Sequence, residues 1–255
     1  MGTKLIVIYS DLQFEDFIYD IVDGNVIITK YQGDKGTLYV PAFINEHKVI
    51  GFDVFDFGSE EVSSIRHIIL PGTIQRFSFW DLNQVETIRI EPGCKCIPDG
   101  AFSHLRNLKL VDLPDTITTI GKEAFAYCKS LQYIRIPDEC TYIGDDAFAY
   151  SGLRDLFIPQ SVREIGRNPF CGCDLLSLHL HPKNQDFTLV DEMVLYTAGC
   201  SRLIWCYPSY PKILQIPEHL TSVDSSALMG CELYGFNIPS GCKAFDGIDL
   251  ASYLM

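Results

Sequence analysis

The sequence lacks long runs of basic residues and long apolar runs. Its 20 basic and 33 acidic residues give a net charge of −13, and the charges are scattered along the chain. Phosphate backbones and anionic lipid headgroups repel an acidic chain, and a membrane-spanning helix needs about 18 consecutive apolar residues. We therefore expect no nucleic-acid partner and no insertion into a membrane.

A recognisable export signal is also missing. The apolar stretch at residues 5–9 is shorter than the apolar core of a secretory signal, which has about 7–15 residues and is followed by a small-residue cleavage site. The chain therefore favours a cytoplasmic location, although a protein whose signal has been removed has the same kind of N-terminus.

The motifs of common enzyme classes are absent too. There is no P-loop, no G-x-G-x-x-G after a strand, no H-E-x-x-H and no G-x-S-x-G. The acidic pair Asp145-Asp146 has the residue types of a general acid and base, but it falls in a recurring turn whose equivalent positions carry Lys122-Glu123. Such variable positions are typical of a solvated turn, so the sequence predicts no catalytic residues and no cofactor.

What the chain does contain is a repeat. Proline recurs at residues 114, 137 and 159, in steps of 23 and 22 residues. Each segment that follows has an I-G-x-x-A-F-like turn and then an L-x-x-I-x-I-like run, and weaker copies begin at Leu70 and Glu91. A fixed period of about 20–29 residues with this spacing of apolar residues is the mark of a leucine-rich repeat.

The segment LQYIRI at 131–136 shows how one unit folds. Ile134 and Ile136 point to one face of a strand and Arg135 points to the other, because side chains alternate along a strand. Pro137 ends the strand because it has no amide hydrogen.

The return segment at 143–148 then runs along the opposite wall. Gly144 allows the bend, while Ile143, Ala147 and Phe148 fill the interior. One unit cannot bury these side chains alone, so neighbouring units stack into a continuous core. About eight coils spaced about 4.8 Å apart give a solenoid about 40 Å long.

The I/L-P…I-G-x-x-A-F…C-x-x-L-x-x-I-x-I pattern resembles the BspA-type leucine-rich repeat over about residues 40–250. The lead-in is similar too, because residues 17–31 are typical of a hairpin that turns at Asp23-Gly24. The resemblance implies a repeat solenoid: a β-rich, right-handed leucine-rich-repeat array with short irregular or helical return segments, an N-terminal β-hairpin cap and one inserted β-hairpin. It also implies a context, since many BspA-type proteins are bacterial surface proteins implicated in adhesion to host matrix or other cells.

We expect two parts, a β cap over residues 1–40 that packs on the array and a solenoid over residues 41–255. The stretch 181–217 breaks the period, and we place the inserted hairpin at about residues 183–210. The family usually has glycine after the aspartate of that hairpin turn, whereas this chain has Glu192, so the type of turn stays open.

The stretch CGCDLLSLHLH at 171–181 looks like a metal site when taken alone. Cys171, Cys173, His179 and His181 are residue types that bind zinc. In the repeat, however, His179 falls on the outward face and His181 at the turn that follows, whereas Cys173 belongs to the opposite wall. We therefore expect no metal site.

Six of the ten cysteines fall in two columns of the repeat where apolar residues also occur, so we expect them to be buried and reduced. Cysteines of one column lie mostly in alternate coils, about 10 Å apart, beyond the limit of about 7 Å between Cα atoms for a disulfide. A core of free thiols favours a reducing environment. The two columns contain Cys128, Cys173 and Cys231, and Cys94, Cys140 and Cys242.

The outward strand positions form a regular ladder on one face of the expected array. Their mixture of arginine, aromatic residues and histidine is similar to the composition of binding surfaces. An ordinary solvated sheet face, and a binding site on the inserted hairpin around Val194 and Trp205, stay as alternatives. The candidate binding residues are Arg89, Tyr133, Arg135, Asp155, Phe157 and His179.

These features predict a non-enzymatic scaffold whose ladder binds a protein ligand. The family context implies a bacterial surface protein in adhesion or host interaction. The missing signal and the free thiols favour an intracellular protein-binding module instead, and a glycan-binding protein is a third hypothesis.

Overall fold

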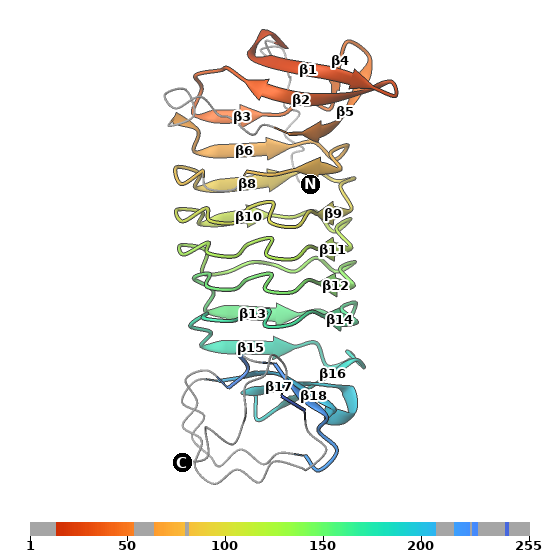
Figure 1. Ribbon diagram of the computed structural model, residues 1–255, viewed down its shortest axis with the longest axis vertical. Helices are drawn as coiled ribbons and strands as arrows, with labels where there is room; N and C mark the ends of the chain where they lie inside the picture. The colour runs from red at the N-terminus through yellow and green to blue at the C-terminus, as the bar shows by residue number, and fades with distance from the viewer. Residues whose placement is uncertain are drawn as a thin grey trace, which may run out of the picture.

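A computed structural model of the chain describes residues 14–53, 64–79, 82–207, 217–224, 226–228 and 243–244. The chain forms an elongated β-solenoid of about eight turns (Figure 1). Within the described residues the helical elements are the short 3₁₀ turns Phe14–Asp16 and Ala198–Cys200 and the 3₁₀ residue Ser64. The predicted fold class is confirmed, but the described return segments contain no α-helix.

The front wall of the solenoid is a ladder of parallel strands stacked in register. Four of them form one sheet, and two further along the chain form another. We call the outward side of this wall, including the segment 131–136 between the two sheets, the ladder face. Its strands are β3 (Thr37–Tyr39), β6 (His67–Leu70), β8 (Thr87–Ile90) and β10 (Leu110–Asp112), then β13 (Asp155–Ile158) and β15 (Ser177–Leu180).

The segment 131–136 differs from the expected strand. Instead of a strand, its main chain forms an isolated bridge between Tyr133 and Asp155. The expected alternation is nevertheless present, since Ile134 and Ile136 are buried and Arg135 is exposed. The spacing of apolar residues determines which side chains face the core, but it does not determine the main-chain hydrogen bonds between neighbouring coils.

Two further walls complete each turn, where one opposite wall was expected. The second wall is a parallel sheet of two-residue strands: β9 (Cys96–Ile97), β11 (Thr119–Ile120), β12 (Tyr142–Ile143) and β14 (Glu164–Ile165). In the third, the A-F turns bond to one another, as where Phe125 N donates to Ala147 O at 2.8 Å. Hydrogen bonds between coils therefore run along all three walls.

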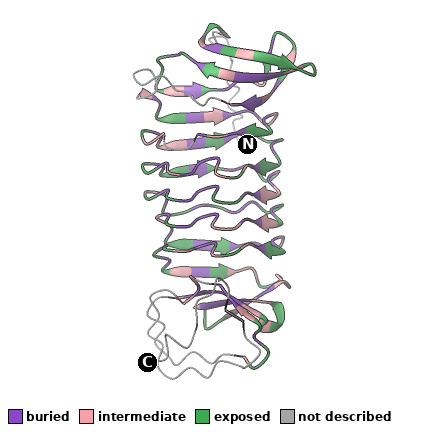
Figure 2. Ribbon diagram, in the orientation of Figure 1, coloured by how far each residue is buried: buried purple, intermediate pink, exposed green. Residues whose placement is uncertain are grey.

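Phenylalanine rings fill the centre of the solenoid. Successive ring centroids are 4.9 to 6.2 Å apart along one continuous stack. Figure 2 shows that buried residues recur in every coil of the described solenoid. Contacts of this kind add about 0.5–1.5 kcal/mol per pair beyond the burial of apolar area. The stack consists of Phe52, Phe79, Phe102, Phe125, Phe148 and Phe170.

Gly144 is required for a reason other than the expected bend. A Cβ atom at this position would lie 2.5 Å from the main-chain nitrogen of Lys122 in the preceding coil. The left-handed backbone conformation of this turn falls instead on Asp146 and Tyr150, with φ of 52° and 56°. Gly144 therefore permits the close approach of neighbouring coils.

The predicted N-terminal hairpin is confirmed. It pairs β1 (Phe17–Val22) with β2 (Asn25–Tyr31) and turns at Asp23 and Gly24, whose φ angles are 50° and 74°. β2 also pairs with β5 (His47–Phe52), which joins β4 (Phe43–Ile44) and β7 (Arg76–Phe77). The ladder itself already begins at β3, so the division of the chain at residue 40 stays a prediction.

The inserted hairpin is confirmed as well, and a third strand extends it. β16 (Phe187–Val190), β17 (Val194–Thr197) and β18 (Arg202–Cys206) form an antiparallel meander, and β19 (Ser222–Val223) and β20 (Lys243–Ala244) continue the sheet in parallel. The turn between β16 and β17 has positive φ at Asp191 and at Glu192, 51° and 59°. Glu192 therefore adopts the conformation for which glycine is the preferred residue.

Candidate functional site

The structure places all six predicted ladder residues on the exposed ladder face. Phe157 lies opposite His179 in the register of β13 and β15, and Tyr133 bridges to Asp155. Arg89 lies on β8, further towards the N-terminus. Because the coils stack in register, these side chains form columns that run along the solenoid.

Large apolar side chains are exposed near the middle of the ladder face. Tyr133 is 55 % exposed and Phe157 is 41 % exposed. Leu110 is 58 % exposed, and it was not among the predicted site residues. The sequence signal that could have identified Leu110 is an apolar residue at an outward position of the repeat, in the column that also contains Thr87 and Tyr133.

Ion pairs also lie on the ladder face. Arg135 donates to Asp115 at 2.5 Å and to Asp138 at 3.2 Å, and the bond to Asp115 is the main reason that its pKa is raised. Arg89 lies 3.7 Å from Asp112. Exposed pairs of this kind contribute about 0–1 kcal/mol to stability, so their main effect here is to set the direction of the charges on the face.

The beginning of the ladder strands carries a second group of charges. Glu86 accepts a hydrogen bond from Lys109 at 2.8 Å and another from Arg66 at 3.2 Å. The bond from Lys109 is the first cause of the lowered pKa of Glu86. The three side chains come from consecutive coils, so the pairs also link coils to one another.

An aromatic stack that was not predicted lies at the corner between the third wall and the ladder. The rings of His104 and Tyr127 are 4.3 Å apart, and those of Tyr127 and Tyr150 are 5.1 Å apart. Lys129 Nζ lies 5.8 and 5.5 Å from the two tyrosine rings. The recurrence of AFSH, AFAY and AFAY in the sequence was the signal that could have predicted this column.

The cysteines and histidines of residues 171–181 do not converge. His179 faces outward on β15, and His181 Nδ1 accepts a bond from the main chain of Lys183 at 3.1 Å. Cys173 is buried and donates to Phe148 O at 2.9 Å. Among the described residues, no three histidine, cysteine or acidic side chains are grouped in a way that could hold a metal ion.

The buried cysteines act as small apolar residues that also donate hydrogen bonds. Cys128 donates to Phe102 O at 3.1 Å, and Cys173 lies 3.3 Å from Ser151 Oγ. Burial raises the pKa of Cys128 to about 12 and that of Cys173 to about 11, so both thiols are neutral near pH 7. Seven cysteines in the described part of the chain are free thiols: Cys94, Cys96, Cys128, Cys140, Cys171, Cys173 and Cys200. Cys231 and Cys242 lie outside the described residues.

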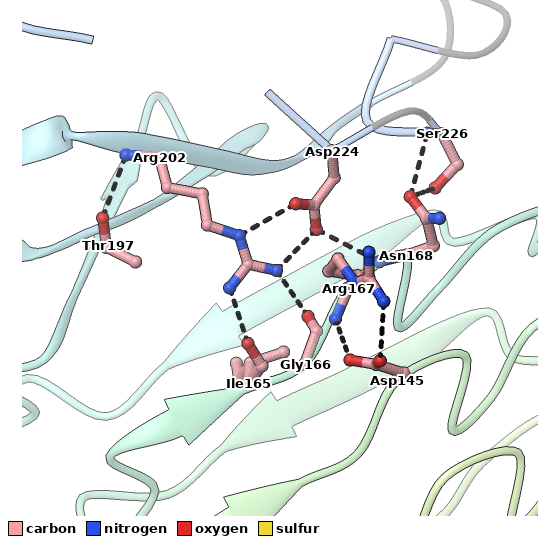
Figure 3. Close-up of polar contacts among 9 residues, drawn as sticks. All are labelled: Asp145, Ile165, Gly166, Arg167, Asn168, Thr197, Arg202, Asp224 and Ser226. Atoms are coloured by element: carbon pink, nitrogen blue, oxygen red, sulfur yellow. Dashed lines mark hydrogen bonds and ion pairs between the residues drawn. The ribbon is translucent and has the colours of Figure 1, made fainter. Parts of the chain in front are cut away.

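The inserted meander is joined to the solenoid by a buried ion pair (Figure 3). Arg202 donates twice to Asp224, at 2.8 Å in each case, and the Asp224 side chain is fully buried. Arg202 also donates to Ile165 O at 2.8 Å and to Gly166 O at 2.6 Å. Asn168 N donates to Asp224 as well, at 3.1 Å.

Arg202 takes the place of a missing main-chain donor. In the preceding coils Gly144 N donates to Ile120 O, and Gly166 N donates to Ile143 O. The next carbonyl along the second wall belongs to Ile165. It accepts a hydrogen bond from the Arg202 side chain instead of from a main-chain N–H, because the meander interrupts the coil. Asp224 stands where the other coils have glycine. The cluster is therefore a structural closure of the second wall.

The alternative binding site around Val194 and Trp205 is not supported by exposed side chains at those positions. Val194 is fully buried and Trp205 is 5 % exposed. Val190, at the end of β16, is one of the exposed apolar residues of the meander. A contact through the meander would therefore involve residues other than Val194 and Trp205.

The comparison with protein families agrees with the repeat and the fold. The profile of the family described as "BspA type Leucine rich repeat region" matches six copies, over residues 57–189 and 206–248. The chain belongs to the BspA-type leucine-rich repeat family. Arrays of this kind serve as extended binding surfaces, since stacked repeats form a long face.

The solved structures compared with this chain here are those of bacterial proteins. The pneumococcal vaccine antigen PcpA superposes with a TM-score of 0.71 at 19 % identity, over 91 % of this chain and 71 % of that one. A leucine-rich cell surface protein from Faecalibacterium prausnitzii gives 0.66 at 23 % identity, over 91 % and 71 %. A leucine-rich repeat protein from Eubacterium ventriosum gives 0.64 at 18 % identity, over 89 % and 58 %. At these identities the likeness concerns the fold alone.

A search of curated proteins found no match. In the described part of the chain, no helix has the length and apolar character needed to cross a membrane.

Proposed function

We propose that this chain is a non-enzymatic scaffold that binds another protein through its ladder face. The observation that carries the proposal is the exposure of Leu110, Tyr133 and Phe157 on one face of the solenoid. Aromatic and arginine side chains supply much of the binding energy of protein interfaces, and Arg135 lies beside these apolar groups in the same ladder. Strands whose main chains are bonded between coils hold such residues at fixed spacing.

We propose that this binding takes place at a bacterial cell surface, in adhesion or host interaction. The proposal is supported by family membership and by the likeness to a protein described as a leucine-rich cell surface protein. A signal peptide or anchor in the coding sequence, and accessibility of the chain to antibody on intact cells, are the expected findings. A chain that stays inaccessible until the cells are lysed would contradict this location.

The free thiols favour a second candidate, an intracellular protein-binding module. Cys94, Cys128, Cys140 and Cys173 are buried and free, and such thiols are typical of reducing compartments. Thiol counting on the denatured protein purified from its native host tests this candidate. Ten free thiols are expected from an intracellular protein, and several disulfides would contradict it.

Single substitutions on the ladder face test the binding proposal. The purified chain captures partners from the host extract, and capture is repeated with Tyr133→Ala, Phe157→Ala and Arg135→Glu. Loss of the same captured protein from all three variants is expected. Ile18→Ala is the matched control, because Ile18 is 48 % exposed on β1 in the cap rather than on the ladder face. Equal loss from the control, or unchanged capture by the three variants, would contradict the proposal.

A further inference from the structure

One border of the ladder face is basic although the chain as a whole is acidic. Arg106, Lys129 and Arg154 are exposed and belong to three consecutive coils, each within a few residues of the start of a ladder segment. Main-chain bonds hold these segments together: Ser130 N donates to Arg106 O at 3.2 Å, and Arg154 N donates to Gln132 O at 3.0 Å. We call Arg106, Lys129 and Arg154 the basic corner.

Within the described part of the chain, no carboxylate forms an ion pair with the basic corner. Among the described residues, ion pairs engage Arg66 and Lys109 with Glu86, but none of the three corner residues lies within 4.0 Å of a carboxylate. Lys129 Nζ instead lies near the rings of the aromatic stack, 5.5 and 5.8 Å from two centroids. Such a contact restricts where its charge lies without cancelling it.

The opposite border of the face is acidic. Asp115, Asp138 and Glu139 are exposed at the turns that follow the ladder segments. Two of them, Asp115 and Asp138, hold Arg135. Exposed basic side chains therefore lie near the starts of these ladder segments and exposed acidic ones at the turns that follow, while Asp155 and Asp174 add acidic side chains near the starts of β13 and β15.

Exposed apolar residues follow the residues of the basic corner closely along the chain. Leu110 begins β10, three residues after Asn107 and four after Arg106, and Tyr133 has the same place four residues after Lys129. A sulfated glycan or another polyanion could use the basic residues, but it has no apolar groups to cover Leu110 and Tyr133. An acidic polypeptide with apolar residues has both kinds of group.

We infer that the partner of the ladder face contributes an acidic segment that also carries apolar side chains. Its carboxylates contact the basic corner, and its apolar residues cover Leu110 and Tyr133. The segment runs along the solenoid across consecutive coils, close to the starts of the ladder segments. This inference rests on the proposed function, because it names the chemistry of the partner that the ladder face binds.

Peptide selection on the intact chain tests the inference. Random 12-residue peptides are selected on immobilised protein, and the binding of synthetic winners is measured by fluorescence polarisation. We expect winners with net negative charge and several apolar residues. Winners that are neutral or basic would overturn the inference.

Three variants locate the binding of those peptides. Reversal of the corner (R106E/K129E/R154E) should weaken binding about tenfold or more at low salt, and by less in 0.5 M NaCl, because salt screens exposed charges. The control K30E/K48E/R163E makes the same change in net charge at exposed positions of the cap and second wall, so it should weaken binding much less. Equal weakening by both triple variants overturns the inference. Circular dichroism melts verify that each variant is folded.

Three further outcomes distinguish the inference of an acidic partner from the proposal that the ladder face binds a protein. Loss of peptide binding in L110A/Y133A together with full binding by the corner variant keeps the proposed function and overturns the acidic partner. Binding of a heparin dodecasaccharide to the corner, without any ladder-dependent peptide, overturns the polypeptide in favour of a glycan. A selection that yields only peptides insensitive to every ladder variant overturns both proposals.

Discussion

The substitution Arg202→Met removes the side chain that closes the second wall of the solenoid. Methionine keeps most of the apolar length of the arginine but none of its donors. Asp224 then remains fully buried without its two bonds of 2.8 Å, and Ile165 O and Gly166 O lose the donors at 2.8 and 2.6 Å. The exposed fraction of the Arg202 side chain is 21 %, so water reaches only part of the site.

The expected cost is large. Breaking a buried ion pair by removing one partner costs about 3–5 kcal/mol, because the other charge stays buried. In the double variant Arg202→Met/Asp224→Gly the buried carboxylate is gone, so most of this cost should disappear. Two carbonyls still lack donors there, and each one that stays buried costs about 1–3 kcal/mol. The double variant should therefore lie between the single variant and the parent.

Urea unfolding, followed both by tryptophan fluorescence and by far-UV circular dichroism, measures the loss of stability. Trp205 is buried on β18 next to the cluster, and its fluorescence in a Trp80→Phe background reports the meander. Far-UV circular dichroism reports the whole array. Because the repeats of a solenoid interact mainly with their neighbours, we expect the Trp205 transition to move to lower urea more than the dichroism transition does.

The effect should also depend on pH. Burial raises the pKa of Asp224, and Arg202 acts against that rise. An acid whose pKa is higher in the folded than in the unfolded state holds its proton more tightly when folded, so stability falls as pH rises through that window. Without Arg202 the pKa is higher still, so the Trp205 transition of the variant should be closer to that of the parent at pH 5 than at pH 8.

Arg167→Met is the matched control, since Arg167 pairs with Asp145 at 3.5 Å while half exposed. Its loss should cost no more than about 1 kcal/mol. A Trp205 transition in Arg202→Met that moves no further than in this control would refute the reasoning. A difference between variant and parent that is constant from pH 5 to pH 8 would refute the assignment of the effect to Asp224.

Three other outcomes follow from the fold. Glu192→Gly should stabilise the meander by about 0.5–1 kcal/mol in the Trp205 assay, because glycine accepts positive φ without the cost that a side chain brings; a loss of stability would contradict the turn geometry. Gly144→Ala should destabilise the array by about 1–3 kcal/mol in thermal melts, since its Cβ meets main-chain atoms of the preceding coil, whereas the control Gly36→Ala meets only an ordinary contact at 3.6 Å and should change little. Iodoacetamide at pH 8 should leave Cys128 and Cys173 unlabelled in the native protein and label both in urea, because burial raises their pKa values to about 12 and about 11; rapid native labelling would show that the core opens.

The positions that repeat in the sequence were the ones that could be predicted. Phe125 and Phe148 recur at one place in the period, and their rings stack in the core with centroids 5.6 Å apart. Arg135 and His179 fall at outward positions of the repeat, and both are exposed. Periodicity carries this information because each coil meets the same environment as its neighbours.

Features that depend on the relation between particular coils could not be predicted in the same way. The missing strand at 131–136 is a matter of main-chain bonding, to which the apolar pattern is insensitive. Arg202 lies in the insertion, outside the repeat, and Asp224 replaces the repeated glycine, so only the fold shows that they meet beside Ile165. Leu110 was visible as an outward apolar residue, but its exposure of 58 % depends on the small area that its neighbours cover.

The uneven bonding of the walls has a mechanical consequence. The second wall is continuous from β9 to β14, whereas the front ladder is divided between β10 and β13. A bending load on the solenoid should therefore separate the front wall at this division, while the continuous second wall resists the bending. Tyr133 lies between the two sheets of the front wall. A ligand that contacts both sheets would therefore stiffen the solenoid against bending.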